Sequence, residues 1–142
     1  MDAKKVKDEL IGAGIEVYRT RQSEIHIAER VRLHIMDSGV RLTLSEPLQV
    51  SFTARSQQSD FPNVDEGVLL EKVRHCVGQD ALARGYVELS SGRVEVTDPS
   101  DTQRVLDVWH EVTYAKPAPD TKAAIHEIQW ALTIERFVSP SS

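Results

Sequence analysis

Alternation of apolar and polar residues between positions 24 and 54 constrains this chain more than any other feature. Apolar side chains take mostly odd positions through Ile25–Ile35 and mostly even positions through Val40–Phe52. A period of two is typical of strands that bury one face and leave the other in water. The segment therefore predicts an antiparallel meander whose apolar face must be covered by other elements.

The expected register of the meander depends on its turns. A two-residue loop at Ser38 and Gly39 places Ile35 opposite Leu42, because glycine is common in tight hairpin turns. Whether residues 24–35 form one strand or two is left open by the pattern. A break near residues 28–30 is favoured, since it keeps the Glu29 carboxylate out of an apolar face where it would be costly.

Helical spacing and turn residues predict the other elements. We expect helices at 2–11, 63–84, 98–112 and 120–138, and a second hairpin at 86–96 that turns at Ser91 and Gly92. Asp98 and Pro99 have the form of a helix cap followed by a first helical residue. The expected fold is α+β, with an antiparallel meander of four or five strands plus a hairpin, covered by helices in the order α-β(4-5)-α-β-β-α-α.

Size and charge limit the classes of function. The chain has 142 residues, which predicts a single domain at 1–138 and a frayed tail at 139–142. Asp and Glu outnumber Lys and Arg by 22 to 17, and no basic run exceeds two residues, so we expect no nucleic-acid partner. One cysteine, no secretion leader and no long apolar run predict a cytoplasmic protein without a membrane partner.

No catalytic motif stands out in the sequence. Phosphate-binding glycine loops and the G-x-S-x-G elbow are missing, and Cys76 is expected to be a small buried apolar residue. We therefore expect no catalytic residue and no cofactor. His110 and His126 fall on different expected helices and are interpreted as surface residues.

Two histidines of the meander form the one weak metal candidate. His26 and His34 share the polar parity, and in one register they face each other with Glu24 or Glu29 as a third ligand. In a register shifted by two, His26 faces Arg32 instead, which opposes metal binding. The favoured interpretation is two solvated histidines and no metal, because two ligands do not make a site.

The last expected helix carries apolar residues on two sides. A surface helix needs an apolar stripe of about 100°, and here two stripes cover roughly two thirds of the circumference. Such excess apolar surface predicts association. The candidate interface residues are Trp130, Ile134, Phe137 and Val138.

Several stretches together resemble the type III secretion chaperone-like fold, including the YbjN-like proteins. They are the helix at 2–11, the meander through Phe52, DFPNVDEGVLLEKV, and GYVELSSGRVEV followed by TQRVLDVWHEV. The chain departs from that family in an extra helix after AKPAP and in more strands before the second helix. The resemblance implies a homodimer that binds an extended segment of a partner protein, without catalysis.

The first hypothesis is thus a non-enzymatic protein-interaction module, chaperone-like or adaptor-like, acting as a homodimer. One alternative is a small-molecule-binding or metal-binding domain, or an enzyme, with its pocket between sheet and helices. Another is a structural subunit of a larger assembly.

Overall fold

The computed structural model describes residues 2–141. Contacts divide the chain into two compact units, Met1–Phe52 with Ala115–Ile134, and Thr53–Tyr114 with Glu135–Ser142. Two strands, β4 (Leu48–Gln57) and β6 (Asp101–Ala118), pass from one unit into the other. The expectations of a single domain and of a frayed tail stay predictions, and Ser142 lies outside the described residues.

The first unit contains the meander and two helices. β1 (Val17–Arg21), β2 (Glu24–Val31), β3 (His34–Thr43) and the start of β4 pair antiparallel in chain order. α1 (Ala3–Gly12) begins where the Asp2 carboxylate accepts the backbone N–H of Lys4 and Lys5. α4 (Thr121–Thr133) packs against α1 and β3. The core of this unit includes Leu10, Ile25, Ile27, Leu42, Phe52 and Ile128.

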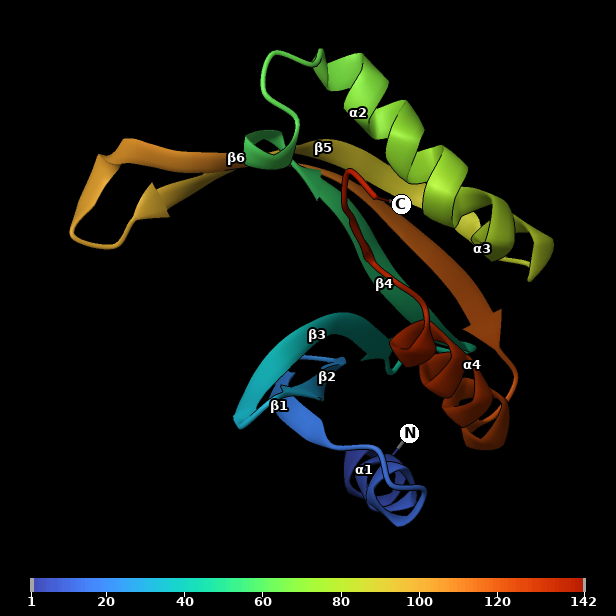
Figure 1. Ribbon diagram of the computed structural model, residues 1–142. Helices are drawn as coiled ribbons and strands as arrows, with labels where there is room; N and C mark the ends of the chain where they lie inside the picture. Colours follow the sequence, from blue (N-terminus) through green and yellow to red (C-terminus); the bar gives the residue numbers. More distant parts are fainter. Residues whose placement is uncertain (1, 142) are drawn as a thin grey trace. The chain divides into compact units, whose positions relative to one another are not determined.

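The second unit contains a helical stretch, the end of β4, most of β6 and two further strands. α2 (Glu66–Val73), a π-helical turn η2 (Arg74–Gly78) and α3 (Gln79–Ala83) follow one another without a break. This stretch runs alongside β5 (Val87–Asp98) and β6 in Figure 1. β7 (Phe137–Val138) pairs parallel with β4, and η1 (Gln58–Asp60) follows β4. The core of this unit includes Leu69, Val73, Ala81, Tyr86, His110, Val112 and Tyr114.

Within residues 2–141, hydrogen bonds join the strands in the order β1-β2-β3-β4-β6-β5, with β7 beside β4. The predicted α+β class with an antiparallel β-meander is confirmed. No helix in this part of the chain is both long enough and apolar enough to cross a membrane.

The predicted turn at Ser38 and Gly39 is wrong. β3 runs through both residues, and the β2–β3 turn is at Arg32 and Leu33, with Val31 paired to His34. The Ser38 hydroxyl donates to the Ile27 carbonyl at 2.6 Å, and Gly39 has φ +81°. The register shifts at this point, so the serine and glycine form a bulge rather than a turn.

The register that followed from that turn is therefore wrong too. Leu42 lies opposite Ile25, not Ile35. The favoured break near residues 28–30 is also misplaced, because β2 continues through them to Val31. The prediction of two strands within residues 24–35 was correct, but the break between them lies at Arg32 and Leu33.

The predicted helix at 98–112 is wrong, because these residues turn the chain and start β6. The Asp98 carboxylate accepts the backbone N–H and the hydroxyl of Ser100 at 2.9 and 2.8 Å, which closes the turn between β5 and β6. The predicted hairpin at Ser91 and Gly92 is consequently wrong as well, since β5 runs straight through both residues. The last helix ends at Thr133, and Phe137 and Val138 belong to β7.

Candidate functional site

The three weak metal candidates lie at separate positions along the β2–β3 ladder. His26 is opposite Arg41, Glu29 is opposite Met36, and His34 is next to the turn, opposite Val31. Neither predicted partner of His26 faces it. Among residues 2–141 no group of three histidine, cysteine or acidic side chains could hold a metal ion.

His26 is a buried member of a cross-strand polar network. The Arg19 guanidinium donates to His26 Nδ1 at 2.9 Å, and His26 Nε2 lies 3.3 Å from the Glu24 carboxylate. Because Nδ1 accepts a hydrogen bond, the ring proton belongs on Nε2, where it is donated to Glu24. Both ring nitrogens are therefore occupied by protein partners, and the network joins β1 to β2.

Asp37 extends this network on β3. Arg41 donates to the two Asp37 carboxylate oxygens at 2.6 and 2.9 Å, and Arg19 lies 3.7 Å away. Burial is the largest single influence on the pKa of Asp37 and raises it. The hydrogen bonds from Arg41 and the Gly39 N–H, together with the positive charge nearby, outweigh burial and hold the pKa below its usual value. The carboxylate thus stays ionised and ties β3 to β1.

The predicted interface residues make contacts inside their own units. The Trp130 ring packs edge-to-face on Phe52 with a centroid distance of 5.8 Å. Phe137 packs edge-to-face on Trp109 at 5.8 Å, and the Arg55 guanidinium lies 5.1 Å from its ring centroid. Val138 is buried, whereas Ile134 is half-buried. These side chains stay a predicted interface, although much of their apolar surface is already in use.

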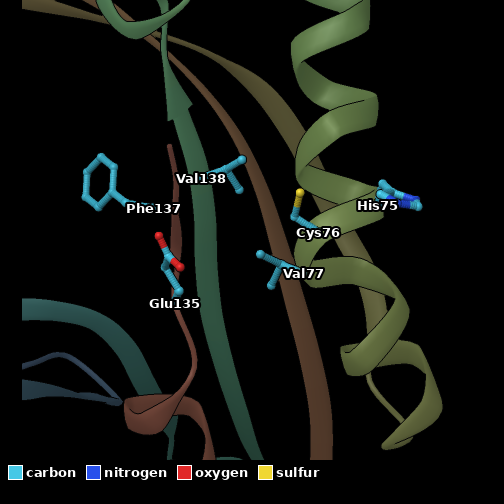
Figure 2. Close-up of a pocket in the computed structure, with 6 residues that line it drawn as sticks. All are labelled: His75, Cys76, Val77, Glu135, Phe137 and Val138. Carbon is cyan, nitrogen blue, oxygen red and sulfur yellow. The ribbon is translucent and has the colours of Figure 1, made fainter. Parts of the chain in front are cut away.

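A pocket of about 400 Å³ lies beside the π-helical turn in the second unit. Its lining residues are His75, Cys76, Val77, Glu135, Phe137 and Val138 (Figure 2). π-helical turns are frequent at functional sites, so the pocket is a reasonable place to look for chemistry. Cys76 is half-buried rather than the expected core residue.

The pocket does not assemble a nucleophile with a base. In Figure 2 the His75 ring points away from the segment that carries Glu135 and Val138, and its Nδ1 lies 3.3 Å from the Gln79 amide. A reactive cysteine needs a base or a cation within hydrogen-bonding reach.

The most distinctive surface lies on residues 87–106 of the β5–β6 hairpin, called the arm below. Its turn end extends beyond the helical stretch of its own unit in Figure 1, whereas its base contacts that stretch through Glu88 and Arg74. Five large apolar side chains on it are exposed, with fractions of 59% for Val87, 60% for Leu89, 39% for Val94, 45% for Val105 and 52% for Leu106. Single exposed apolar residues are ordinary, but five on one hairpin indicate an interaction surface.

Charged side chains of the arm have oppositely charged partners within the same chain. Arg93 donates to the Glu95 carboxylate at 2.8 Å, and Arg104 lies 3.9 Å from the Asp98 carboxylate. At the base of the arm, Glu88 accepts from Arg74 at 2.8 Å, a hydrogen bond that raises the pKa of the guanidinium. What the arm leaves unmatched is therefore its apolar side chains.

Sequence reasoning missed the arm because it assigned these residues to a short hairpin and a helix. A signal was present: Leu106, Val108, Val112 and Tyr114 fall on even positions of a stretch rich in β-branched residues. His110 interrupts the apolar alternation, although its ring is buried and donates from Nε2 to Gln58 at 2.8 Å. The interpretation of His110 as a surface residue is thus wrong.

Comparison of the chain with models of known families, with curated proteins and with solved structures finds no match.

Proposed function

We propose that this protein is a non-enzymatic, chaperone-like or adaptor-like interaction module of the cytoplasm that associates with itself and binds a segment of a partner protein through the arm. The observation that supports this most strongly is the set of five exposed apolar side chains on residues 87–106. The resemblance to type III secretion chaperone-like proteins points to the same function but carries no part of this argument. A nucleic-acid or membrane partner is not proposed, because the chain has a net charge of -5.

We expect the arm to bind a partner because a hairpin with both faces in water is poorly stabilised by itself. An isolated two-stranded hairpin is marginal in water, whereas three or more strands with a covered apolar face are stable. Burying apolar surface contributes about 25 cal/mol per Å². Contact with another strand or surface would therefore stabilise the arm and use its apolar side chains.

The mode of binding that suits such an arm is strand addition. β5 is the last strand in the hydrogen-bonded order of the described residues, so one of its edges has no strand beside it. In strand addition, backbone hydrogen bonds supply affinity and alternate side chains supply specificity. An extended segment of another protein, or a strand of a second copy, presents the matching edge.

A second candidate function rests on the pocket beside η2. Its volume of about 400 Å³ falls within the range of small-molecule sites, and its facing walls include Val77 and Val138. A small apolar ligand would fit this lining. We rank it below the arm, because the ring of His75, one of its polar groups, points away from the facing segment.

The arm proposal is tested with a double variant, Leu89→Ser with Leu106→Ser, and light scattering on a sizing column. The wild-type protein is expected to elute as a dimer and the double variant as a monomer with unchanged circular dichroism. Leu33→Ser is the matched control, because Leu33 is 98% exposed at the β2–β3 turn, outside the arm. It should dimerise like the wild type.

A strictly monomeric wild-type protein would contradict self-association. Loss of the dimer in Leu33→Ser but not in the arm variant would move the surface to the β2–β3 turn. A mass many times that of one chain would favour the alternative of a structural subunit.

A further inference from the structure

The strand that forms the outer edge of the arm carries a charge pattern that is complementary to itself. We propose that two copies of this chain join by antiparallel pairing of their β5 edges about a two-fold axis at Val94. This inference rests on the proposed function, because it names the partner and the register of the self-association. It adds a specific pairing geometry, which can be wrong even if the protein does associate with itself.

The pairing follows from the order of three residues in β5. With Val94 opposite Val94 of the second copy, Arg93 of each copy lies opposite Glu95 of the other. In an antiparallel pair, directly opposed side chains share a face and have Cβ atoms about 5 Å apart. Arg93 and Glu95 already lie on one face, 2.8 Å apart, with side chains 47% exposed. The pairing would therefore assemble two arginines and two glutamates with alternating signs.

Other registers use the charges of β5 less well. An axis at Arg93 sets two arginines against each other, and an axis between Ser91 and Gly92 sets Glu88 against Glu95. Like charges directly opposite are destabilising.

Two further registers would pair Arg93 with Glu88 or with Asp98. Both carboxylates are already engaged: Glu88 binds Arg74, and Asp98 accepts from Ser100. In the Val94 register the carboxylate used is Glu95, whose donor in its own chain is Arg93 itself, so the pairing extends that contact instead of competing with a donor outside it.

Gly92 is a second, independent observation that points to a strand beside β5. A Cβ placed on Gly92 would meet no atom within 4 Å, and its φ is not positive, so neither packing nor turn geometry in its own chain requires glycine. Glycine inside a strand often marks the close approach of another backbone. In the proposed pairing Gly92 lies opposite Val96 of the second copy, where the missing side chain leaves room.

The edge also lacks lysine and proline, two of the residues that commonly block such pairing. Exposed edge strands are commonly protected by lysine or proline. β5 reads VELSSGRVEVTD and contains neither residue, and it is exposed from Val87 through Glu95. Pairing over residues 90–98 would convert two separate hairpins into one four-stranded sheet, which is a size that is stable in water.

The decisive experiment mixes two charge variants. Arg93→Glu places glutamate at both positions 93 and 95, and Glu95→Arg places arginine at both, so each variant alone should dimerise at least about tenfold more weakly than wild type. The intrachain ion pair is lost in both variants and is not restored by mixing. A one-to-one mixture should nevertheless recover a dimer of wild-type strength, because each arginine again faces a glutamate of the other copy.

Two controls accompany the mixture. Lys122→Glu makes the same change in net charge as Arg93→Glu at an exposed position of α4, and it should leave the dimer unchanged. In a Cys76→Ser background, Val94→Cys should form a disulfide between copies under a mild oxidant, because opposed residues lie within disulfide range. Thr102→Cys should not, since the two β6 strands would be about 14 Å apart, three strand spacings.

The results separate this inference from the proposed function. If both charge variants dimerise as strongly as the wild type and Val94→Cys forms no disulfide, the β5 pairing is overturned and self-association still stands. A monomeric wild-type protein would overturn both. Heterodimers from the mixture together with the disulfide are the expected result.

Discussion

At the scale of single residues, Gly78 shows how one missing side chain fixes the packing of the second unit. It is the last residue of the π-helical turn and is fully buried, and the hydroxyl of the buried Tyr114 lies where its Cβ would be. Burial raises the pKa of Tyr114, which keeps the phenol neutral at this contact. Only glycine lets the helix approach β6 this closely.

Gly78→Ala should destabilise the protein by about 1–3 kcal/mol, as overpacking does in a filled core. Urea unfolding measures the change. Adding Tyr114→Phe should recover part of the loss, because the hydroxyl is the nearest atom to the new methyl group. Gly12→Ala in α1 is the matched control: no atom lies within 4 Å of its Cβ position, so it should be neutral or stabilising. Equal losses at both glycines would refute the steric explanation.

Asp37 gives the first unit a dependence on pH. Its folded-state pKa is lowered, so it contributes stability above its unfolded pKa of about 3.9, and this contribution is lost as pH falls through the folded value. Asp37→Asn should therefore be less stable than wild type at pH 7. The difference should shrink steadily below pH 4.

Denaturant unfolding at pH 7 and at successive acid pH values measures that difference. Asp8→Asn, an exposed carboxylate of α1, removes the same charge and serves as control. A gap between wild type and Asp37→Asn that stays constant with pH would mean that the ionised form is not favoured by folding.

At the scale of elements, Asp98 and Pro99 show why the sequence predicts a helix where the structure has a turn and a strand. An aspartate that accepts an N–H two residues on occurs both at helix N-caps and in turns, and here Ser100 supplies that N–H. The residues after it, Val105, Leu106, Val108 and Val112, satisfy helical spacing as well as near alternation. Local sequence therefore allowed both structures, and pairing with β5 and β4 decided between them.

The meander was easier to predict, because one buried face imposes parity on every strand. Its turns were not, since serine and glycine suit a bulge as well as a hairpin loop. Ser38 and Gly39 sit in a bulge, whereas the actual turn uses Arg32 at φ +58°. A non-glycine residue with positive φ gives little warning in the sequence.

A substitution in helix α4 tests whether the extra apolar surface of this helix belongs to the core or to an interface. Trp130 is half-buried and packs on Phe52 in the same unit. Trp130→Ala should lower the unfolding free energy by about 2–3 kcal/mol, through lost burial and the lost aromatic contact.

Gln129→Ala, at the exposed neighbouring position, should change stability little. Thermal unfolding followed by circular dichroism compares the two variants. A fully stable Trp130→Ala protein that no longer dimerises would instead favour the interface predicted from the sequence.

At the scale of the whole molecule, the fold class could be predicted from the sequence, whereas the candidate functional surface could not. Strands grouped before helices, joined by short connections, suffice to predict an α+β protein. The arm could not be predicted in the same way, because alternation reports that one face is apolar and does not report what covers it. Val94 and Leu106 are as apolar as Val40 and Leu42, yet only the latter pair is buried.

The central claim is that the arm pairs with another copy, and hydrogen exchange at two protein concentrations tests it most directly. Above the dimer dissociation constant, amides of residues 90–98 should exchange more slowly than they do on dilution, because their edge has become hydrogen-bonded. Peptides from α1 should exchange equally at both concentrations. Identical exchange of residues 90–98 at every concentration, with light scattering confirming that the mass has changed from dimer to monomer, would contradict the claim.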